Sequence, residues 1–423
     1  MPASPSLLIV PARFKTGKLY TQIATTSAGV VLGSSGDFNV TRATTATRFN
    51  SAGLIESVAS GVPRLDYYTS GGTAGCPALL VEASGSNFLL QSEAFNTTWT
   101  PLGLNAFGAG SIANSTGTTD PFGGTNSDYI QENASSGTHI ILQTPAGQVS
   151  GTTYTFSCFV KSAQRTQVNF LNNAGGGANA TFNLSAGTAT LGIGVSALIQ
   201  NYGNGWYRCI LTYTPTTTAN FNVQVRLADA SGNTSYTGTG TSGVYVFGAQ
   251  LEVGSIATSY IPTTTTSATR TAEVINLSGA VSGCIGQTEG TIYLQTDALV
   301  SGASDLFCFA RATTNTVSIS KNSSNIIQAT VYTSGLALYI AASGTVSGNM
   351  KIAFAYKSGS SALYINGVPI GTSSTAFSFT AALTQININA TGFFEGRGIQ
   401  RISALPLYTT RLTDPELADL TTL

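Results

Sequence analysis

The sequence predicts an all-β fold with an extended N-terminal arm, two tandem jelly-roll β-sandwiches and a short C-terminal helix. Alternating apolar and polar residues recur along the chain, in runs such as "TYTFSCFVKS", "NFNVQVRLA" and "MKIAFAYK". This alternation is typical of half-buried strands. Gly, Ser, Asn and Thr bound the runs, and helical periodicity is nearly absent. Short strands without intervening helices are typical of sandwiches and jelly rolls.

Three segments and a connector follow from the composition along the 423 residues. Residues 1–90 are irregular and carry several basic side chains, which predicts an arm-like region with a few strands. A first sandwich is expected over 91–263. The Thr-rich residues 264–271 show neither apolar periodicity nor turn chemistry, so we expect an exposed linker there. A second sandwich is expected over 272–423.

The end of the chain, "RLTDPELADLTTL", predicts the only convincing helix. Thr413 or Asp414 is the expected N-cap, and Pro415 suits the first turn. Glu416 would lie near the positive end of the helix dipole. We interpret this helix as a lid on a sheet rather than as the carrier of a catalytic Asp414 and Glu416 pair.

The charge content excludes several function classes. The chain has 18 basic and 18 acidic residues, and only 9% of its residues are charged. So few charges argue against a basic surface that binds nucleic acid. No apolar run approaches the roughly 18 residues that span a bilayer, so no membrane is expected as a partner. There is no zinc spacing and no phosphate-binding glycine loop, so we expect no metal and no cofactor.

The cysteines and the start of the chain indicate where the protein is made. The five cysteines are far apart, and three of them lie in strand-like runs. We interpret them as buried thiols of a protein synthesised in a reducing cytoplasm, not as a disulfide framework. The first residues, "MPASPSLLIVPARFK", also lack the basic region and long apolar core of a secretory signal.

Two tryptophans are the candidate sugar platforms. Trp206, in "NGWYRC", has Asn204 close by, and an exposed ring beside amides is what a pyranose site needs. A tryptophan that follows a glycine turn and enters a strand more often packs in a sandwich, and we favour that interpretation for Trp206. Trp99, in "FNTTWTPLG", is as consistent with an exposed ring as with a buried one. Trp99, Trp206 and Asn204 are therefore the glycan-binding candidates.

Catalysis is not expected. His139 is the only histidine and has no identifiable partners for a triad, so a structural role is favoured. The loop from Asp120 to Asp128 is rich in oxygen ligands, but its spacing fits turn chemistry better than a calcium site. The acidic residues are scattered, and the Glu-x-Asp-x-x-Glu pattern of many concanavalin A-like hydrolases is absent. No paired carboxylates of the kind that glycosidases use can be identified.

Three blocks resemble known modules. The run "FNVTRATTATRFNSAGLIESVASGVPRLDY" with "CPALLVEASGSNFLLQSEAFNTTWT" resembles the N-terminal region of bacteriophage virion proteins of the tail or structural class. The runs "NGWYRCILTYTPT" and "GVYVFGAQLEVGSIATSYIPT" are similar to a carbohydrate-binding-module-type jelly roll. The run "KIAFAYKSGSSALYINGVPIG", with Asn366 and Gly367 at a hairpin turn, and "ISALPLYTTRLTDPELADL" resemble concanavalin A-like, laminin-G-type domains.

The resemblance implies a phage structural protein on the virion surface, synthesised in the cytoplasm of the bacterial host. A tail fibre, spike or baseplate appendage that helps attach to a host-surface glycan is the first expectation. A head fibre or capsid decoration protein with an architectural role is the alternative, and a polysaccharide depolymerase is a third. The expected partners are other virion proteins through residues 1–90, further copies of the chain, with a trimer favoured, and a host-surface polysaccharide.

Overall fold

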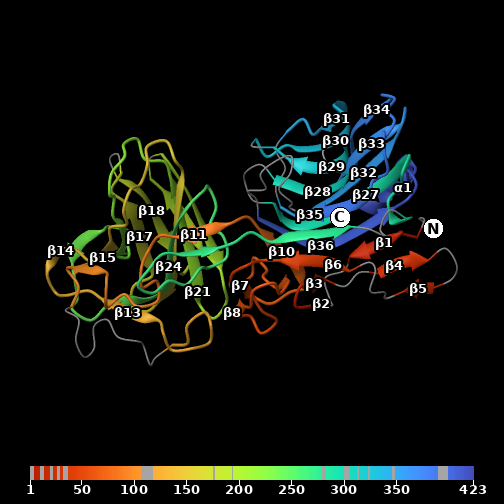
Figure 1. Cartoon of the computed structure of the whole chain (residues 1–423). Helices are drawn as coiled ribbons and strands as arrows, with labels where there is room; N and C mark the ends of the chain where they lie inside the picture. Colours follow the sequence, from red (N-terminus) through yellow and green to blue (C-terminus); the bar gives the residue numbers. More distant parts are fainter. Residues whose placement is uncertain are drawn as a thin grey trace.

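The structure is a computed structural model of the chain. It describes residues 4–9, 14–19, 22–25, 29–31, 37–105, 118–174, 177–192, 194–278, 283–299, 304–311, 314–322, 324–344, 348–388 and 399–423. Within these residues, no helix has the length and apolar character needed to cross a membrane. Figure 1 shows two β-rich lobes, with the N-terminal strands lying below and between them.

The first lobe is a sandwich of two antiparallel sheets. Among the described residues, one sheet has six strands in the order β12-β15-β22-β17-β18-β19. These are β12 (Thr100–Leu102), β15 (Ile140–Gln143), β22 (Val223–Ala228), β17 (Gln167–Asn172), β18 (Ala178–Asn183) and β19 (Thr188–Leu191). The other has five, in the order β13-β24-β16-β21-β20. These are β13 (Asp128–Gln131), β24 (Gly243–Val253), β16 (Tyr154–Ser162), β21 (Trp206–Tyr213) and β20 (Val195–Asn201).

The core of this sandwich follows the alternation of the sequence. Phe156 and Leu211 of the five-stranded sheet pack in one buried cluster with Phe170 and Val225 of the six-stranded sheet. Their neighbours in sequence point to the outer faces, because successive side chains of a strand alternate. Each sheet therefore has an outer face whose side chains do not belong to this core.

The second lobe contains a large sheet built from both ends of the chain. In the described residues its main path is β34-β33-β32-β27-β36-β1-β4-β5, and β10 joins β36 to β9. The strands are β34 (Val368–Ser373), β33 (Ser361–Ile365), β32 (Met350–Lys357), β27 (Glu289–Leu299), β36 (Ile399–Tyr408), β1 (Leu7–Ile9), β4 (Gln22–Thr25), β5 (Gly29–Val31), β10 (Ala78–Glu82) and β9 (Arg64–Asp66).

The facing sheet of the second lobe has the described order β2-β3-β6-β26-β35-β28-β29-β30-β31. Its strands are β2 (Phe14–Lys15), β3 (Lys18–Leu19), β6 (Phe38–Thr41), β26 (Val274–Ser278), β35 (Gln385–Ile388), β28 (Ser304–Arg311), β29 (Asn315–Lys321), β30 (Ile327–Thr333) and β31 (Leu336–Ala341). One buried cluster joins the two sheets, with Leu7, Phe38 and Leu79 beside Ile292 and Phe354.

The described part of residues 1–90 is not the extended arm that the sequence analysis expects. Strand β1 pairs with β36, with Leu7 opposite Leu407, and β6 pairs with β26, with Val40 opposite Ile275. The run Ala78–Glu82 is buried at every position. These strands complete the second sandwich because their apolar residues find partners several hundred residues along the chain.

The described residues also form three pairs of short strands outside the four large sheets. They are β11 (Gly85–Asn87) with β25 (Ala268–Arg270), β14 (Ser136–Thr138) with β23 (Ser235–Thr237), and β7 (Ala46–Phe49) with β8 (Ile55–Val58). The β11–β25 pair corrects the expectation for residues 264–271. Residues 264–267 are exposed, as expected of a linker, but Arg270 is buried.

The chain end and the last hairpin agree with the sequence analysis. Helix α1 (Asp414–Thr421) has Thr413 as N-cap, and the Thr413 N–H donates to Glu416 Oε2 over 2.8 Å. Asn366 and Gly367 both have positive φ, 51° and 79°, and join β33 to β34, as a two-residue hairpin turn requires.

The expectation of buried cysteines is confirmed in part: Cys158, Cys209 and Cys284 are buried, whereas Cys76 is exposed and the side chain of Cys308 is outside the described residues. The all-β sandwich fold is confirmed.

Candidate ligand-binding cleft

The two tryptophans are both buried. Trp206 is 2% exposed, and its Nε1 donates to the carbonyl oxygen of Thr119 over 2.8 Å. It lies on the outer face of the five-stranded sheet, in a small apolar cluster with Phe159 and Tyr260. Trp99 is 3% exposed and stacks at a tilt on Phe95, with ring centroids 4.7 Å apart. Neither indole offers a free face to a sugar, so the packing interpretation of Trp206 holds.

Asn204 lies at the exposed tip of the hairpin between β20 and β21. Its φ is 51°, between Gly203 at 78° and Gly205 at 79°. This run of left-handed conformations explains the turn, because Asn and Gly adopt positive φ most readily. Asn204 is therefore accessible but is not grouped with an exposed tryptophan ring.

The other singled-out residues have structural roles. The Asp120 carboxylate accepts the backbone N–H groups of Phe122, Gly124 and Asn126 within 2.9 Å, which is turn chemistry. His139 is buried, with Nδ1 2.5 Å from the carbonyl oxygen of Gly103. No group of three His, Cys, Asp or Glu side chains suited to a metal occurs in the described residues.

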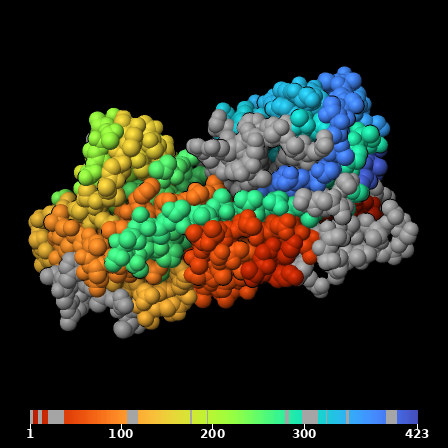
Figure 2. Space-filling view, viewed as in Figure 1, coloured from red at the N-terminus to blue at the C-terminus, as the bar shows by residue number. Residues whose placement is uncertain are grey.

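A cleft of about 820 Å³ lies where the N-terminal strands meet the two sandwiches. Its floor is the outer face of the five-stranded sheet, where Phe159, Arg208 and Gln200 form one row across β16, β21 and β20. Leu198 belongs to the next row and is 52% exposed. The space-filling view shows the molecule narrowing between its two lobes (Figure 2).

Two half-buried tyrosines from different segments form the aromatic wall of the cleft. Tyr68 follows β9, and Tyr202 follows β20. Their ring centroids are 4.9 Å apart, and Phe49 meets both rings edge-on. Burial raises the pKa of both tyrosines. Both rings therefore stay neutral hydrogen-bonding groups attached to an apolar surface.

The charged groups of the cleft are already engaged. Asp66 pairs with Arg401 over 3.0 Å and accepts the Phe49 N–H. Arg48 pairs with Glu56 over 2.6 Å. Arg208 donates to Ser157 Oγ and to the Thr258 carbonyl oxygen, and its guanidinium lies 5.4 Å from the Phe159 ring centre.

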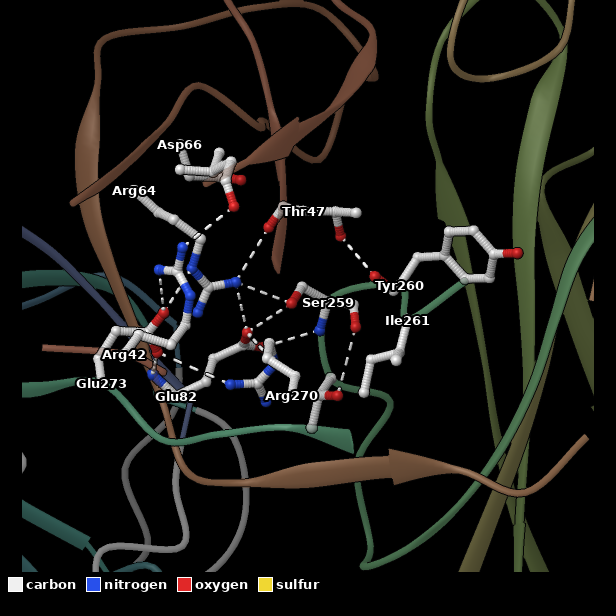
Figure 3. Close-up of polar contacts among 12 residues, drawn as sticks. Arg42, Thr47, Arg64, Asp66, Glu82, Ser259, Tyr260, Ile261, Arg270 and Glu273 are labelled. Carbon is white, nitrogen blue, oxygen red and sulfur yellow. Dashed lines mark hydrogen bonds and ion pairs between the residues drawn. The ribbon is translucent and has the colours of Figure 1, made fainter. Parts of the chain in front are cut away.

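A buried cluster of three arginines and two glutamates lies next to the cleft. It consists of Arg42, Arg64, Arg270, Glu82 and Glu273. Figure 3 shows the guanidinium groups converging on the two carboxylates. Ser259, at the end of the first sandwich, donates through N and Oγ to Glu82, which also lines the cleft. Burial alone would raise the pKa of Glu82, but Arg270, Arg64 and Ser259 outweigh it and lower the pKa to about 2. The cluster joins the N-terminal segment, the first sandwich and the connector.

Sequence analysis did not find this cleft. Tyr68 and Tyr202 are 134 positions apart, and neither belongs to a motif. The sequence contains one weak signal, because Tyr202 directly precedes the glycine turn that leads into Trp206. The alternation places Trp206 and Arg208 on one face, as expected, but it cannot show that another segment covers that face.

Comparisons with known proteins show faint likenesses. No family model and no curated protein matches the sequence. Among solved structures, the CBM40 module of the Ruminococcus gnavus IT-sialidase bound to α2,3-sialyllactose is 15% identical over 33% of this chain and 84% of that chain, with a TM-score of 0.29. Domain 4 of an extracellular arabinanase from Geobacillus stearothermophilus, in complex with arabinotriose, is 18% identical over 40% and 84%, with a TM-score of 0.29. A pentraxin from Limulus polyphemus is 16% identical over 31% and 68%, with a TM-score of 0.25. At such TM-scores these likenesses carry no functional argument for this chain.

Proposed function

We propose that this chain is a non-enzymatic surface protein of a bacteriophage virion that binds a neutral host-surface glycan in the cleft between its two sandwiches. The observation that carries the binding site is the pair of half-buried tyrosine rings, Tyr68 and Tyr202, in a cleft that Gln200 also lines. Aromatic rings cover the apolar face of a pyranose, and amide and phenol groups bind its hydroxyls.

The ionic state of the cleft favours a neutral ligand. Asp66, Arg48 and Arg401 each have an opposite charge within 3.0 Å. An added charged group would compete with these pairs and would lose its hydration on entering. A neutral saccharide avoids both costs.

The same pairing supports binding rather than hydrolysis. Glycosidases need a carboxyl group that can give up a proton and a second carboxylate placed to act with it. Among the described residues, the carboxylates that line the cleft are Asp66, paired with Arg401, and Glu82, whose pKa is about 2. Glu82 therefore holds no proton to donate near neutral pH.

The place on the virion is part of the proposal, because the sequence resemblance covers tail, baseplate and capsid proteins alike. We assign the chain to a tail fibre, spike or baseplate appendage that oligomerises, with a trimer favoured. The N-terminal segment supplies β5 at one edge of the ten-stranded sheet and β2 at one edge of the facing sheet. Edge strands pair readily with other chains, which suits contacts of residues 1–90 with other virion proteins.

An architectural head fibre or capsid decoration protein is the second candidate. The burial of both tryptophan rings favours it, because a structural role needs no exposed aromatic platform. The two proposals differ in one outcome, which is glycan binding by the isolated chain.

The test is binding of the full-length protein to an array of bacterial surface polysaccharides. We expect binding to at least one neutral glycan and a loss of about tenfold or more in the Tyr68→Ala, Tyr202→Ala double variant. Tyr339→Ala is the matched control, because Tyr339 is 53% exposed on β31 and does not line the cleft. Absence of glycan binding, or equal binding by the double variant, would overturn the cleft proposal and favour the architectural one.

A further inference from the structure

Arg226 is a cation without a carboxylate partner. Among the arginines whose side chains are described, all except Arg226 and Arg208 form ion pairs with Asp or Glu. Arg226 Nε donates to Gln224 Oε1 over 2.7 Å, and this is the one side-chain hydrogen bond of Arg226 to a described residue. Its burial lowers the pKa of the guanidinium, and no acidic neighbour among the described residues counters that effect. The side chain thus bears a desolvation cost that the chain itself does not offset.

Arg226 stands in a polar row on the outer face of the six-stranded sheet. The strand registers place Arg226 opposite Asn169, Asn169 opposite Thr181, and Thr181 opposite Thr190. These residues lie on the neighbouring strands β22, β17, β18 and β19, and four strands span about 14 Å. The Asn169 amide donates to Thr181 Oγ1 over 3.0 Å, which fixes its orientation.

The row is open at one end. Thr190 is exposed, and Thr181 and Arg226 are half-buried. The inner face of the same strands carries Val225, Phe170 and Phe182 in the core, so the row faces away from the sandwich interior. It also lies on the opposite side of this sandwich from the cleft, whose floor is the five-stranded sheet.

We propose that this row is a second binding site, at which the Arg226 guanidinium takes an anionic group, carboxylate or sulfate, of an acidic polysaccharide. A guanidinium has five donors in a planar fork that matches a carboxylate, and only one of them is used here. Thr181 and Thr190 extend the site with hydroxyl groups that suit the hydroxyls of neighbouring sugars, and the buried Asn169 amide holds Thr181 in place. The centres of protein interfaces are enriched in aromatic residues, Met and Arg, and apart from Arg226 the row contains none of these.

The experiment measures binding of the full-length protein to three probes by calorimetry: an oligogalacturonate for carboxylates, dextran sulfate for sulfates, and unmodified dextran as the neutral reference. The wild type is expected to bind an anionic probe and not dextran, with affinity that falls as salt is added. Binding only to oligogalacturonate identifies a carboxylate site, and equal binding to dextran sulfate identifies a site for either anion.

The variants assign the binding to Arg226. Arg226→Gln should weaken binding by about tenfold or more, and Arg226→Lys should retain part of it, because lysine keeps the charge but not the fork. Arg411→Gln is the matched control, since it removes the same charge beside helix α1. Unchanged unfolding midpoints show that the variants are folded. Equal binding by Arg226→Gln, or no binding of either anionic probe by the wild type, overturns the proposal.

This site is independent of the proposed cleft. The Tyr68→Ala, Tyr202→Ala double variant should keep full affinity for the anionic probe while losing the neutral glycan. Arg226→Gln should show the reverse pattern. Loss of both activities in both variants would contradict two separate sites.

Discussion

Arg64 Nη1 lies 2.8 Å from Glu82 Oε2, and each side chain is at most 1% exposed. Arg64 is on β9 and Glu82 is on β10, which pair with each other. Glu82 also accepts two hydrogen bonds from Ser259, which follows the last strand of the first sandwich. This single carboxylate therefore connects the two lobes at the base of the cleft.

Glu82→Gln should destabilise the protein strongly. The substitution leaves Arg64 and Arg270 with one fewer buried counter-charge, and breaking a buried pair from one side costs about 3 to 5 kcal/mol. Urea unfolding at pH 7 measures the effect. Glu56→Gln is the control, because the Arg48–Glu56 pair is partly exposed and should contribute less than about 1 kcal/mol.

The same carboxylate predicts a pH dependence. The folded state lowers the pKa of Glu82 from 4.5 to about 2, so the stabilisation is fully present above about pH 4.5 and is lost as the pH falls toward 2. The difference in unfolding free energy between wild type and Glu82→Gln should shrink over this range by about 3 kcal/mol. A difference that stays constant from pH 6 to pH 2.5 would contradict the assignment.

Asp128 should behave in the opposite sense. Burial raises the pKa of this carboxyl from 3.8 to about 6, although its Oδ2 accepts the Phe95 N–H. The folded state then binds the proton more tightly than the unfolded chain, so stability falls as the pH rises from about 4 to 6. Asp128→Asn removes this titrating group. Its effect on the unfolding free energy should therefore be more favourable at pH 8 than at pH 4, by about 1 to 3 kcal/mol. Thermal unfolding at the two pH values is the measurement, and an effect of equal size at both would contradict it.

Two glycines of one hairpin provide a matched test of how closely the N-terminal loop at Gly72 packs against the turn between β20 and β21. Gly203 and Gly205 have almost the same φ, 78° and 79°. A Cβ on Gly203 would lie 2.4 Å from the Gly72 carbonyl oxygen, whereas a Cβ on Gly205 would lie 3.4 Å from the Lys161 side chain. Both alanine variants carry the cost of a left-handed alanine, about 1 kcal/mol.

Gly203→Ala should in addition separate the loop at Gly72 from the hairpin. We expect it to be less stable than Gly205→Ala by a further 1 kcal/mol or more, an order-of-magnitude value for backbone overpacking, and to reduce glycan binding in the cleft. Denaturant unfolding and the glycan array compare the pair. Equal stability would show that the loop does not pack against the turn.

Trp206→Ala tests the packing role of the indole. Truncating this buried ring should cost about 3 to 5 kcal/mol. Trp206→Phe should cost less, because it keeps an aromatic ring in the cluster and loses only part of the buried volume together with the hydrogen bond to Thr119. Leu336→Ala, at a side chain that is 56% exposed, should change the unfolding free energy by less than about 0.5 kcal/mol. A Trp206→Ala variant as stable as the wild type would contradict the packing role and support an exposed, sugar-binding ring.

Local rules explain the features that the sequence analysis predicted correctly. The alternation in "YTFSCFV" places Phe156 and Cys158 in the core and Phe159 on the other face. Thr413 caps α1, and the Asn366–Gly367 turn joins its two strands. Each of these features depends on residues within a few positions of one another, so the sequence pattern contains the information.

The sequence pattern was enough to predict many strands of the two sandwiches, the Asn366–Gly367 turn, the closing helix and the face of residues such as Trp206 and Arg208, because period and turn chemistry are local properties. The tertiary structure was needed to show that Leu7 pairs opposite Leu407, that Arg64 and Glu82 meet Arg270, and that Tyr68 reaches Tyr202. These contacts depend on which strand edges pair and which outer face another segment covers. Burial of apolar surface and the pairing of desolvated charges select that arrangement, and both are properties of the whole chain.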